Sequence, residues 1–216
     1  MRALAADRAG SLAVGDALRD GNLAIVPTDT VYGIAADIAN DDAVRAIYAA
    51  KRRQPDFPLQ ILVGRDPAML DAYADVAPVA RGLADALGPG GWTIIVPARS
   101  GWDSPALSGG LTVGFRIVPV EATLDVIDAL GRPLAATSAN LSGMPSPTTC
   151  AEAIAQVGQA CAVAMDAGPA SVGLDSTVID LAGEVPRILR EGAIDRATIA
   201  RILNLGHIPV VRSVRS

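Results

Sequence analysis

The chain has 216 residues, of which half are hydrophobic and only 3% aromatic, and it carries a net charge of −5 with a pI of about 4.8. This acidic balance argues against a general nucleic-acid-binding protein, which typically carries a basic stripe or a basic pI. One histidine and two cysteines, Cys150 and Cys161, are too few for a Cys/His zinc site, and we expect both thiols to be buried and reduced. No apolar run approaches the roughly 18 residues of a membrane span, and the N-terminus lacks the apolar segment of a signal peptide. We therefore expect a cytoplasmic protein with no membrane contact.

Helices and strands interleave in the first half of the chain. We expect helices over 11–20, from Asn40 to about residue 51 and from Pro78 to Gly88, and strands over 23–26, 59–63 and 93–96. Asn40 is a favourable N-cap, and Pro78 with Gly88 follows the usual asymmetry of helix ends. Lys51 continues the apolar stripe of its helix, so its side chain is expected to reach water or a cleft. Pro55 and Pro58 favour an end to this helix by Arg52.

The second half continues the alternation. We expect helices over 120–130, 149–157 and 195–206, and strands over 112–118, 134–137, 161–165, 176–181 and 186–190. In the strand that begins at Thr112, alternation places Arg116 on the face opposite the apolar side chains. The last two strands are joined by three residues, 182–184, which is too short for a crossover and predicts an antiparallel pair. The whole pattern predicts an α/β fold, a single domain with a twisted mixed sheet and flanking helices.

Four polar clusters lie at or near the ends of these elements. They are PTDTVYG at 27–33, the Lys51-Arg52-Arg53 run, the Ser/Asn/Gly-rich segment 138–148, and Asp175-Ser176-Thr177 followed by Arg190. Polar side chains beyond buried strands stand where α/β sheets bind ligands, and small polar residues offer donors to phosphates. Each cluster alone is equally compatible with a capped turn or a polar surface loop. The sequence lacks a P-loop and the GxGxxG and GxSxG motifs.

Taken together and in order, the blocks resemble one family. PTDTVYGIAA, AKRR, GPGGWT, VGFR, SANLSGMPSPT, VGLDSTVID and RILREGAI are similar to successive blocks of the YrdC-like threonylcarbamoyl-AMP synthases. The resemblance covers about residues 11–203 of a domain expected to span 1–216. It implies the short, single-domain form of the family.

The resemblance also implies a set of site residues. Lys51 and Arg53 match the element that faces the ATP phosphates and the reacting carbamate, so they are the expected catalytic residues. Thr30, Arg116 and Ser176 match contacts to threonine. The expected contacts to ATP are Lys51, Arg53, Thr112, Ser138, Asn140, Ser146 and Arg190.

The implied activity is that of a nucleotidyltransferase, L-threonylcarbamoyladenylate synthase. It would condense ATP, L-threonine and bicarbonate into threonylcarbamoyl-AMP and pyrophosphate, with Mg²⁺ arriving on the triphosphate. Separate transferase proteins would then modify adenosine 37 of tRNA to t6A. Asp29 is the nearest candidate for a general base, and no metal-ligand set is expected on the protein.

Two alternatives remain, and the chain departs from the family pattern at several positions. The alternatives are a double-stranded-RNA binding module, or a weak RNA contact by the enzyme, and a relative that uses carbamoyl phosphate. The departures are Phe57, Leu62, Trp92, Thr137 and Glu191. We expect them to lie at the rim of the pocket and to affect substrate preference more than reaction class.

Overall fold

The computed structural model describes residues 1–54 and 57–211. Its elements in the first half of the chain are β1 (Arg2–Ala5), α1 (Arg8–Arg19), β2 (Leu23–Val26), β3 (Gly33–Asp37), α2 (Asp41–Ala50), β4 (Gln60–Val63), α3 (Pro78–Leu87) and β5 (Trp92–Pro97). Those in the second half are β6 (Thr112–Ile117), α4 (Glu121–Leu130), β7 (Leu134–Ser138), α5 (Cys150–Val157), β8 (Cys161–Asp166), β9 (Thr177–Asp180), β10 (Arg187–Arg190) and α6 (Arg196–Ile202). Three short 3-10 turns cover Pro67–Ala72, Pro105–Leu107 and Gly158–Ala160.

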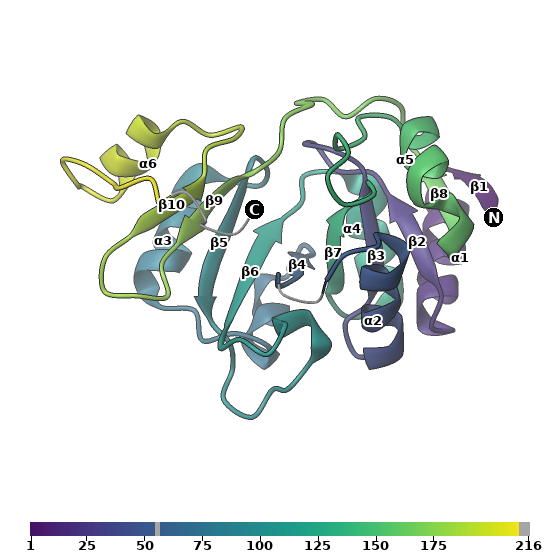
Figure 1. The fold of residues 1–216 in the computed structure, drawn as a ribbon, viewed down its shortest axis with the longest axis horizontal. Helices are drawn as coiled ribbons and strands as arrows, with labels where there is room; N and C mark the ends of the chain where they lie inside the picture. The colour runs from purple at the N-terminus through teal and green to yellow at the C-terminus, as the bar shows by residue number, and fades with distance from the viewer. Residues whose placement is uncertain (55–56, 212–216) are drawn as a thin grey trace.

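The strands form one mixed sheet in the order β1-β8-β2-β3-β7-β4-β6-β5-β9-β10. Parallel pairing joins β8 to β1 and β2, β4 to β6, and β5 to β9, while the other neighbours are antiparallel. Figure 1 shows β5, β9, β10 and α6 at one end of the molecule and β1, β2, β8 and α1 at the other. The expected α/β domain with a mixed sheet, and the antiparallel pair β9/β10, are confirmed.

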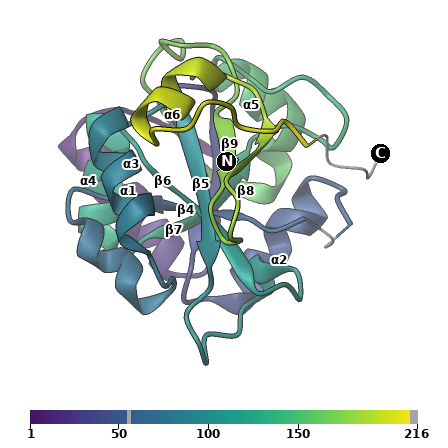
Figure 2. The same ribbon diagram turned by 90° about the vertical axis from the view of Figure 1, so that its left-hand side faces the viewer.

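The two faces of the sheet have different partners. On one face, alternate residues of β8, β2, β3, β7 and β4 pack against α1 and α4. On the other face, the residues between them pack with α2, α3, α5 and α6 in the larger core cluster. Figure 2 shows α1 and α4 on the side of the sheet opposite α2 and α5. The alternation follows from the two-residue period of a strand.

Strand β6 extends this alternation into the functional part of the molecule. Val113 and Phe115 belong to the larger core cluster. Thr112, Gly114 and Arg116 point to the opposite face and line a cavity. The expected orientation of Arg116, away from the apolar face of its strand, is therefore confirmed.

Side-chain caps mark the starts of several helices. Asn40 accepts from the backbone N–H of Ala43 at 3.0 Å, and Thr149 and Glu152 form the expected capping box of α5. Helix α1 begins earlier than expected because Asp7 caps it by accepting from the N–H of Gly10 at 2.8 Å. The last helix, α6, ends at Ile202 instead of residue 206, and Asn204 then adopts a positive φ of 55°. Sequence patterning missed β1 and β3.

Helix α2 ends within the cationic run of residues 51–53. Lys51 is the C-cap, and Arg52 turns the chain with a φ of 51° in the left-handed region. Residues 51 and 53 therefore leave the helix in different directions, and the expected end of the helix by Arg52 is confirmed. Pro55, which was expected to help end it, lies outside the described residues. Within the described ranges, no helix has the length and apolarity that crossing a membrane would need.

Candidate active site

A cavity of about 470 Å³ lies on the sheet face that continues from the α1/α4 side. Its floor is made by alternate residues of β4, β5, β6, β7 and β9, which include Gln60, Thr93, Gly114, Ala136 and Val178. A Cβ added to Gly114 would lie 2.9 Å from the Cγ2 of Thr93 and would fill part of this floor. A hollow of this size on one face of a sheet can bind a small ligand.

Charged side chains line this cavity in a chain that is acidic as a whole. Arg53, Arg116 and Arg190 are among the lining residues, with Asp175 as the carboxylate. Three positive charges and one negative charge give these described residues a local excess of positive charge, against −5 for the whole chain. Such a field favours an anionic ligand.

Arg116 and Asp29 form a buried ion pair beside the cavity. The side chains are 2% and 8% exposed, and the Arg116 Nη2 donates to the Asp29 Oδ1. The second carboxylate oxygen of Asp29 accepts from the N–H of Gly91 at 2.9 Å. A Cβ on Gly90 would lie 2.7 Å from that oxygen, so the loop must pass close to it. Because each oxygen of Asp29 accepts a hydrogen bond, this carboxylate holds both Arg116 and the loop at Gly91.

Thr30 completes the surroundings of Arg116. Its hydroxyl, fully buried, accepts from the Arg116 Nη1 at 2.6 Å and lies 3.1 Å from the hydroxyl of Thr28. The Nε of Arg116 is buried and has no hydrogen-bond partner among the described residues. Burial lowers the pKa of Arg116, and the Asp29 carboxylate opposes this change. The arginine therefore lines the cavity while its Nε lies buried behind the exposed part of the side chain.

Arg53 reaches the cavity from the loop after α2. Its guanidinium lies 5.2 Å from the centre of the Phe57 ring and 6.0 Å from that of Tyr48. Its Nη1 donates to the hydroxyl of Thr137 at 3.4 Å. Contact with aromatic faces holds the planar group at the wall of the cavity.

Lys51 lies behind the cavity wall and not on it. Its Nζ donates to the carbonyl oxygen of Ser138, to that of Asn140 at 2.7 Å and to the Asn140 Oδ1 at 3.1 Å. These three acceptors match the three donors of an ammonium group. The expectation that Lys51 reaches water or a cleft is wrong, because it is 3% exposed and binds the loop that begins at Ser138.

The pKa of Lys51 can be measured directly by NMR. Burial, followed by the charge of Arg53, lowers this pKa to about 8. Lys51 is the only lysine in the sequence, so lysine labelled with ¹³C gives one side-chain NMR signal. We expect the ¹³Cε shift of this signal to titrate near pH 8, and a midpoint near the unperturbed value of about 10.4 would contradict the buried environment.

The lowered pKa of Lys51 also makes the free energy of unfolding depend on pH. Because the folded pKa is below the unfolded pKa, the unfolded chain binds more protons between the two values. The contribution of Lys51 to the free energy of unfolding therefore rises as the pH increases from about 8 to about 10.4. Lys51→Met should remove that rise, as measured by urea unfolding of both proteins at pH 7.5 and pH 10.

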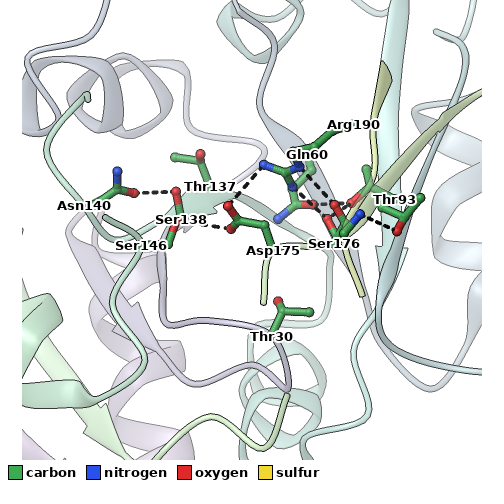
Figure 3. Close-up of polar contacts among 12 residues, drawn as sticks. Thr30, Gln60, Thr93, Thr137, Ser138, Asn140, Ser146, Asp175, Ser176 and Arg190 are labelled. Carbon is green, nitrogen blue, oxygen red and sulfur yellow. Dashed lines mark hydrogen bonds and ion pairs between the residues drawn. The ribbon is translucent and has the colours of Figure 1, made fainter. Parts of the chain in front are cut away.

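A chain of hydrogen bonds with one ion pair crosses the other side of the cavity (Figure 3). Ser146 donates to Asp175 at 3.1 Å, and Asp175 lies 3.6 Å from Arg190. Arg190 donates to the Ser176 hydroxyl at 3.1 Å and to the Ser176 carbonyl at 3.0 Å. Ser176 in turn lies 2.8 Å from Thr93, whose hydroxyl donates to the Gln60 Oε1 at 3.0 Å. The arginine is thus tied to the cavity floor.

The structure brings the ten expected site residues to one place. Six of them line the cavity: Arg53, Thr112, Arg116, Ser138, Ser176 and Arg190. The other four each contact a lining residue: Thr30 contacts Arg116, Lys51 and Asn140 contact Ser138, and Ser146 contacts Asp175. Their roles toward a ligand stay predictions.

Sequence reasoning included Asp175 in one of the four polar clusters, but it missed Gln60 and Thr93 as members of the site. Gln60 begins a buried strand, and Thr93 occupies the alternate face of β5, so each is a polar residue in an apolar run. That interruption of the pattern was the available signal. Of the departures from the family pattern, Phe57 and Thr137 line the cavity as expected, but Trp92 and Leu62 are fully buried in the core, so their expected place at the rim was wrong. The two cysteines are free and buried as expected.

Comparison with known proteins adds independent information. A family model for the Sua5, YciO and YrdC proteins, described as "Telomere recombination", matches residues 16–192. A threonylcarbamoyl-AMP synthase of Bacillus subtilis is 35% identical over 192 residues, which are 88% of this chain and 56% of that protein. A putative threonylcarbamoyl-AMP synthase of Mycobacterium tuberculosis is 36% identical over 195 residues, which are 89% of this chain and 88% of that protein.

A solved structure gives the corresponding result for the fold. The crystal structure of P. abyssi Sua5 complexed with L-threonine superimposes with a TM-score of 0.90 at 31% identity. The match covers 97% of this chain and 62% of that chain. The chain thus spans nearly the whole M. tuberculosis relative, but only a little more than half of the B. subtilis and P. abyssi proteins.

Proposed function

The chain belongs to the Sua5/YciO/YrdC family, and we propose that it condenses L-threonine, bicarbonate and ATP into threonylcarbamoyl-AMP and pyrophosphate. The observation that carries this proposal is the cavity, in which Arg53, Arg116 and Arg190 converge on one sheet face of an acidic protein. Its volume and its mixture of apolar and cationic lining suit a small molecule with several negative charges. The names of the relatives and the threonine complex of P. abyssi Sua5 support the choice of substrates.

The reaction brings negative charge into this small volume. The amine of threonine would add to bicarbonate or CO₂ and form a carbamate, with loss of water in the case of bicarbonate. A carbamate oxygen would then attack the α-phosphorus of ATP, and the bond to pyrophosphate would break. Catalysis of this kind depends chiefly on positioning and on fixed positive charge.

The residues divide into two groups for this chemistry. Thr30, Arg116 and Ser176 would bind threonine, with the positive charge of Arg116 attracting its carboxylate. Arg53 and Arg190 would face the phosphates. The loop from Ser138 to Ser146, held by Lys51, would supply the remaining nucleotide contacts together with Thr112.

We propose that Mg²⁺ accompanies the triphosphate and offsets part of its charge. Within the described ranges, no group of three or more His, Cys, Asp or Glu side chains could hold a metal ion. The ligands of the ion would be phosphate oxygens and water, as is usual for Mg²⁺. Asp175, on the cavity wall, is placed to accept hydrogen bonds from such waters.

The product would pass to separate proteins that transfer the threonylcarbamoyl group to adenosine 37 of tRNA. Direct RNA binding has less support, because the cationic run of residues 51–53 does not form a surface patch. Lys51 is buried and Arg53 turns into the cavity, which leaves Arg52 as the exposed member of the run. A diffuse basic face of the kind that binds RNA would need all three at the surface.

Pyrophosphate release tests this function. We expect release from ATP and Mg²⁺ to require both threonine and bicarbonate, and mass spectrometry to detect the adenylate. Serine should be used about 10- to 200-fold less efficiently, because one methyl group in a pocket contributes about 1–3 kcal/mol. Equal turnover with glycine and threonine would exclude threonine as the specific substrate.

A further inference from the structure

The hydrogen-bond chain from Arg190 to Gln60 has one defined direction. Arginine can only donate, so the Ser176 hydroxyl accepts from Arg190. The single hydroxyl proton of Thr93 goes to the Gln60 Oε1, so Thr93 must accept from Ser176. All donors in the chain therefore point toward Gln60.

The contact with Thr93 shows which atoms of the Gln60 amide remain available. Its oxygen is occupied by Thr93, which leaves the Nε2 group with two N–H donors. No hydrogen bond joins this nitrogen to another described residue, and Gln60 lines the cavity. The amide therefore presents donors to whatever occupies the cavity.

The place of Gln60 indicates which part of a ligand it meets. In the sheet, Gln60 pairs with Gly114, two residues before Arg116 on the same face. Its hydrogen-bonded chain leads through Thr93 to Ser176. Both Arg116 and Ser176 belong to the threonine group of the proposed function, so the amide lies on the amino-acid side of the cavity.

We propose that Gln60 is a substrate-positioning residue, whose Nε2 donates to an oxygen of the amino acid or of the carbamate made from it. This inference rests on the proposed function for the identity of the substrate. A charge-neutral donor suits this position, because it orients an anionic oxygen without a fixed charge that would hold the product. The Thr93 hydroxyl keeps the amide from rotating, which reduces the entropy lost on binding.

Two substitutions at Gln60 separate the donor from the shape of the side chain. Gln60→Met retains the length but removes the donor, and Gln60→Glu replaces the donor by a negative oxygen. Calorimetric titration should show threonine affinity reduced about 10-fold in the first, the usual loss for one hydrogen bond to a charged group, and more in the second. The affinity for ATP with Mg²⁺ should change less than threefold in Gln60→Met.

Gln159, an exposed glutamine of the 3-10 turn Gly158–Ala160, provides the matched control. Gln159→Met and Gln159→Glu should leave both affinities unchanged, and melting temperatures of all variants report any loss of fold. Unchanged threonine affinity in Gln60→Met, or equal losses for threonine and ATP, would overturn the positioning role. Wild-type protein that binds threonine but releases no pyrophosphate would contradict the proposed function. The role of Gln60 in threonine binding would still be decided by the calorimetric titrations.

Discussion

Replacing Asp29 with alanine is expected to lower the free energy of unfolding by about 3–5 kcal/mol, the largest stability effect we predict. Asp29 is the carboxylate partner of a guanidinium that is only 2% exposed. Without it, Arg116 would stay charged and buried with one hydrogen bond, to Thr30. The N–H of Gly91 would lose its acceptor as well. Urea unfolding of the wild type and the variant measures the difference.

The exposed pair of Arg99 and Asp75 is the control for this experiment. Its atoms lie 2.6 Å apart, but the side chains are 54% and 47% exposed. Water screens such a pair, so Asp75→Ala should cost no more than about 1 kcal/mol. If Asp29→Ala costs as little as Asp75→Ala, the buried pair does not hold the loop. Threonine affinity should fall in Asp29→Ala alone, because only that change releases Arg116.

The largest effect on activity is expected at Lys51. Lys51→Met should reduce threonylcarbamoyl-AMP formation by about 100-fold, which corresponds to about 2.7 kcal/mol of transition-state stabilisation. The reason is positional, since the ammonium group holds the carbonyl oxygens of Ser138 and Asn140 and, through them, the loop on the nucleotide side. Hydrogen bonds to a charged group contribute about 1.5–3 kcal/mol each, so even partial release of the loop reaches this magnitude.

The neighbouring arginines serve as comparison and control. Arg53→Ala should also abolish most activity, but with less loss of stability, because its guanidinium lines the cavity. Arg52→Ala should retain activity, since Arg52 is exposed and turns the chain away. ATP should raise the melting temperature of the wild type and of Arg52→Ala more than that of the other two. Near-wild-type adenylate formation by both Lys51→Met and Arg53→Ala would refute the assignment.

Local signals were sufficient for much of the fold. The caps at Asn40 and Thr149 and the proline and glycine around α3 fixed element ends that the structure reproduces. Strand β3 was missed because its residues, Gly33–Asp37, are all buried and show no alternation. Strand β1 was missed because it is an exposed edge strand that pairs only with β8, far away in sequence. Neither feature can be read from a short window.

The site was predictable in membership but not in arrangement. Family resemblance selected residues that the sheet does bring together, but the burial of Lys51 was not predicted. Its position depends on three acceptors in a loop almost ninety residues away, which no periodicity reveals. The buried pairing of Asp29 was likewise not predicted, because a carboxylate in a polar motif gives no sign that its oxygens bind Arg116 and Gly91. Long-range pairing decides both cases.

The division of each central strand between core and cavity has a consequence for how this protein could be modified in the laboratory. If β6 slipped by one residue against its neighbours, Gly114 and Arg116 would replace Val113 and Phe115 in the core. The packed face therefore determines the register of the strand. Positions such as Gln60, Ile95 and Val178 face the hollow without sharing the packing of their neighbours. A library of substitutions restricted to those positions would vary the selectivity for the amino acid. It would leave the packed side chains on the opposite face of the sheet unchanged.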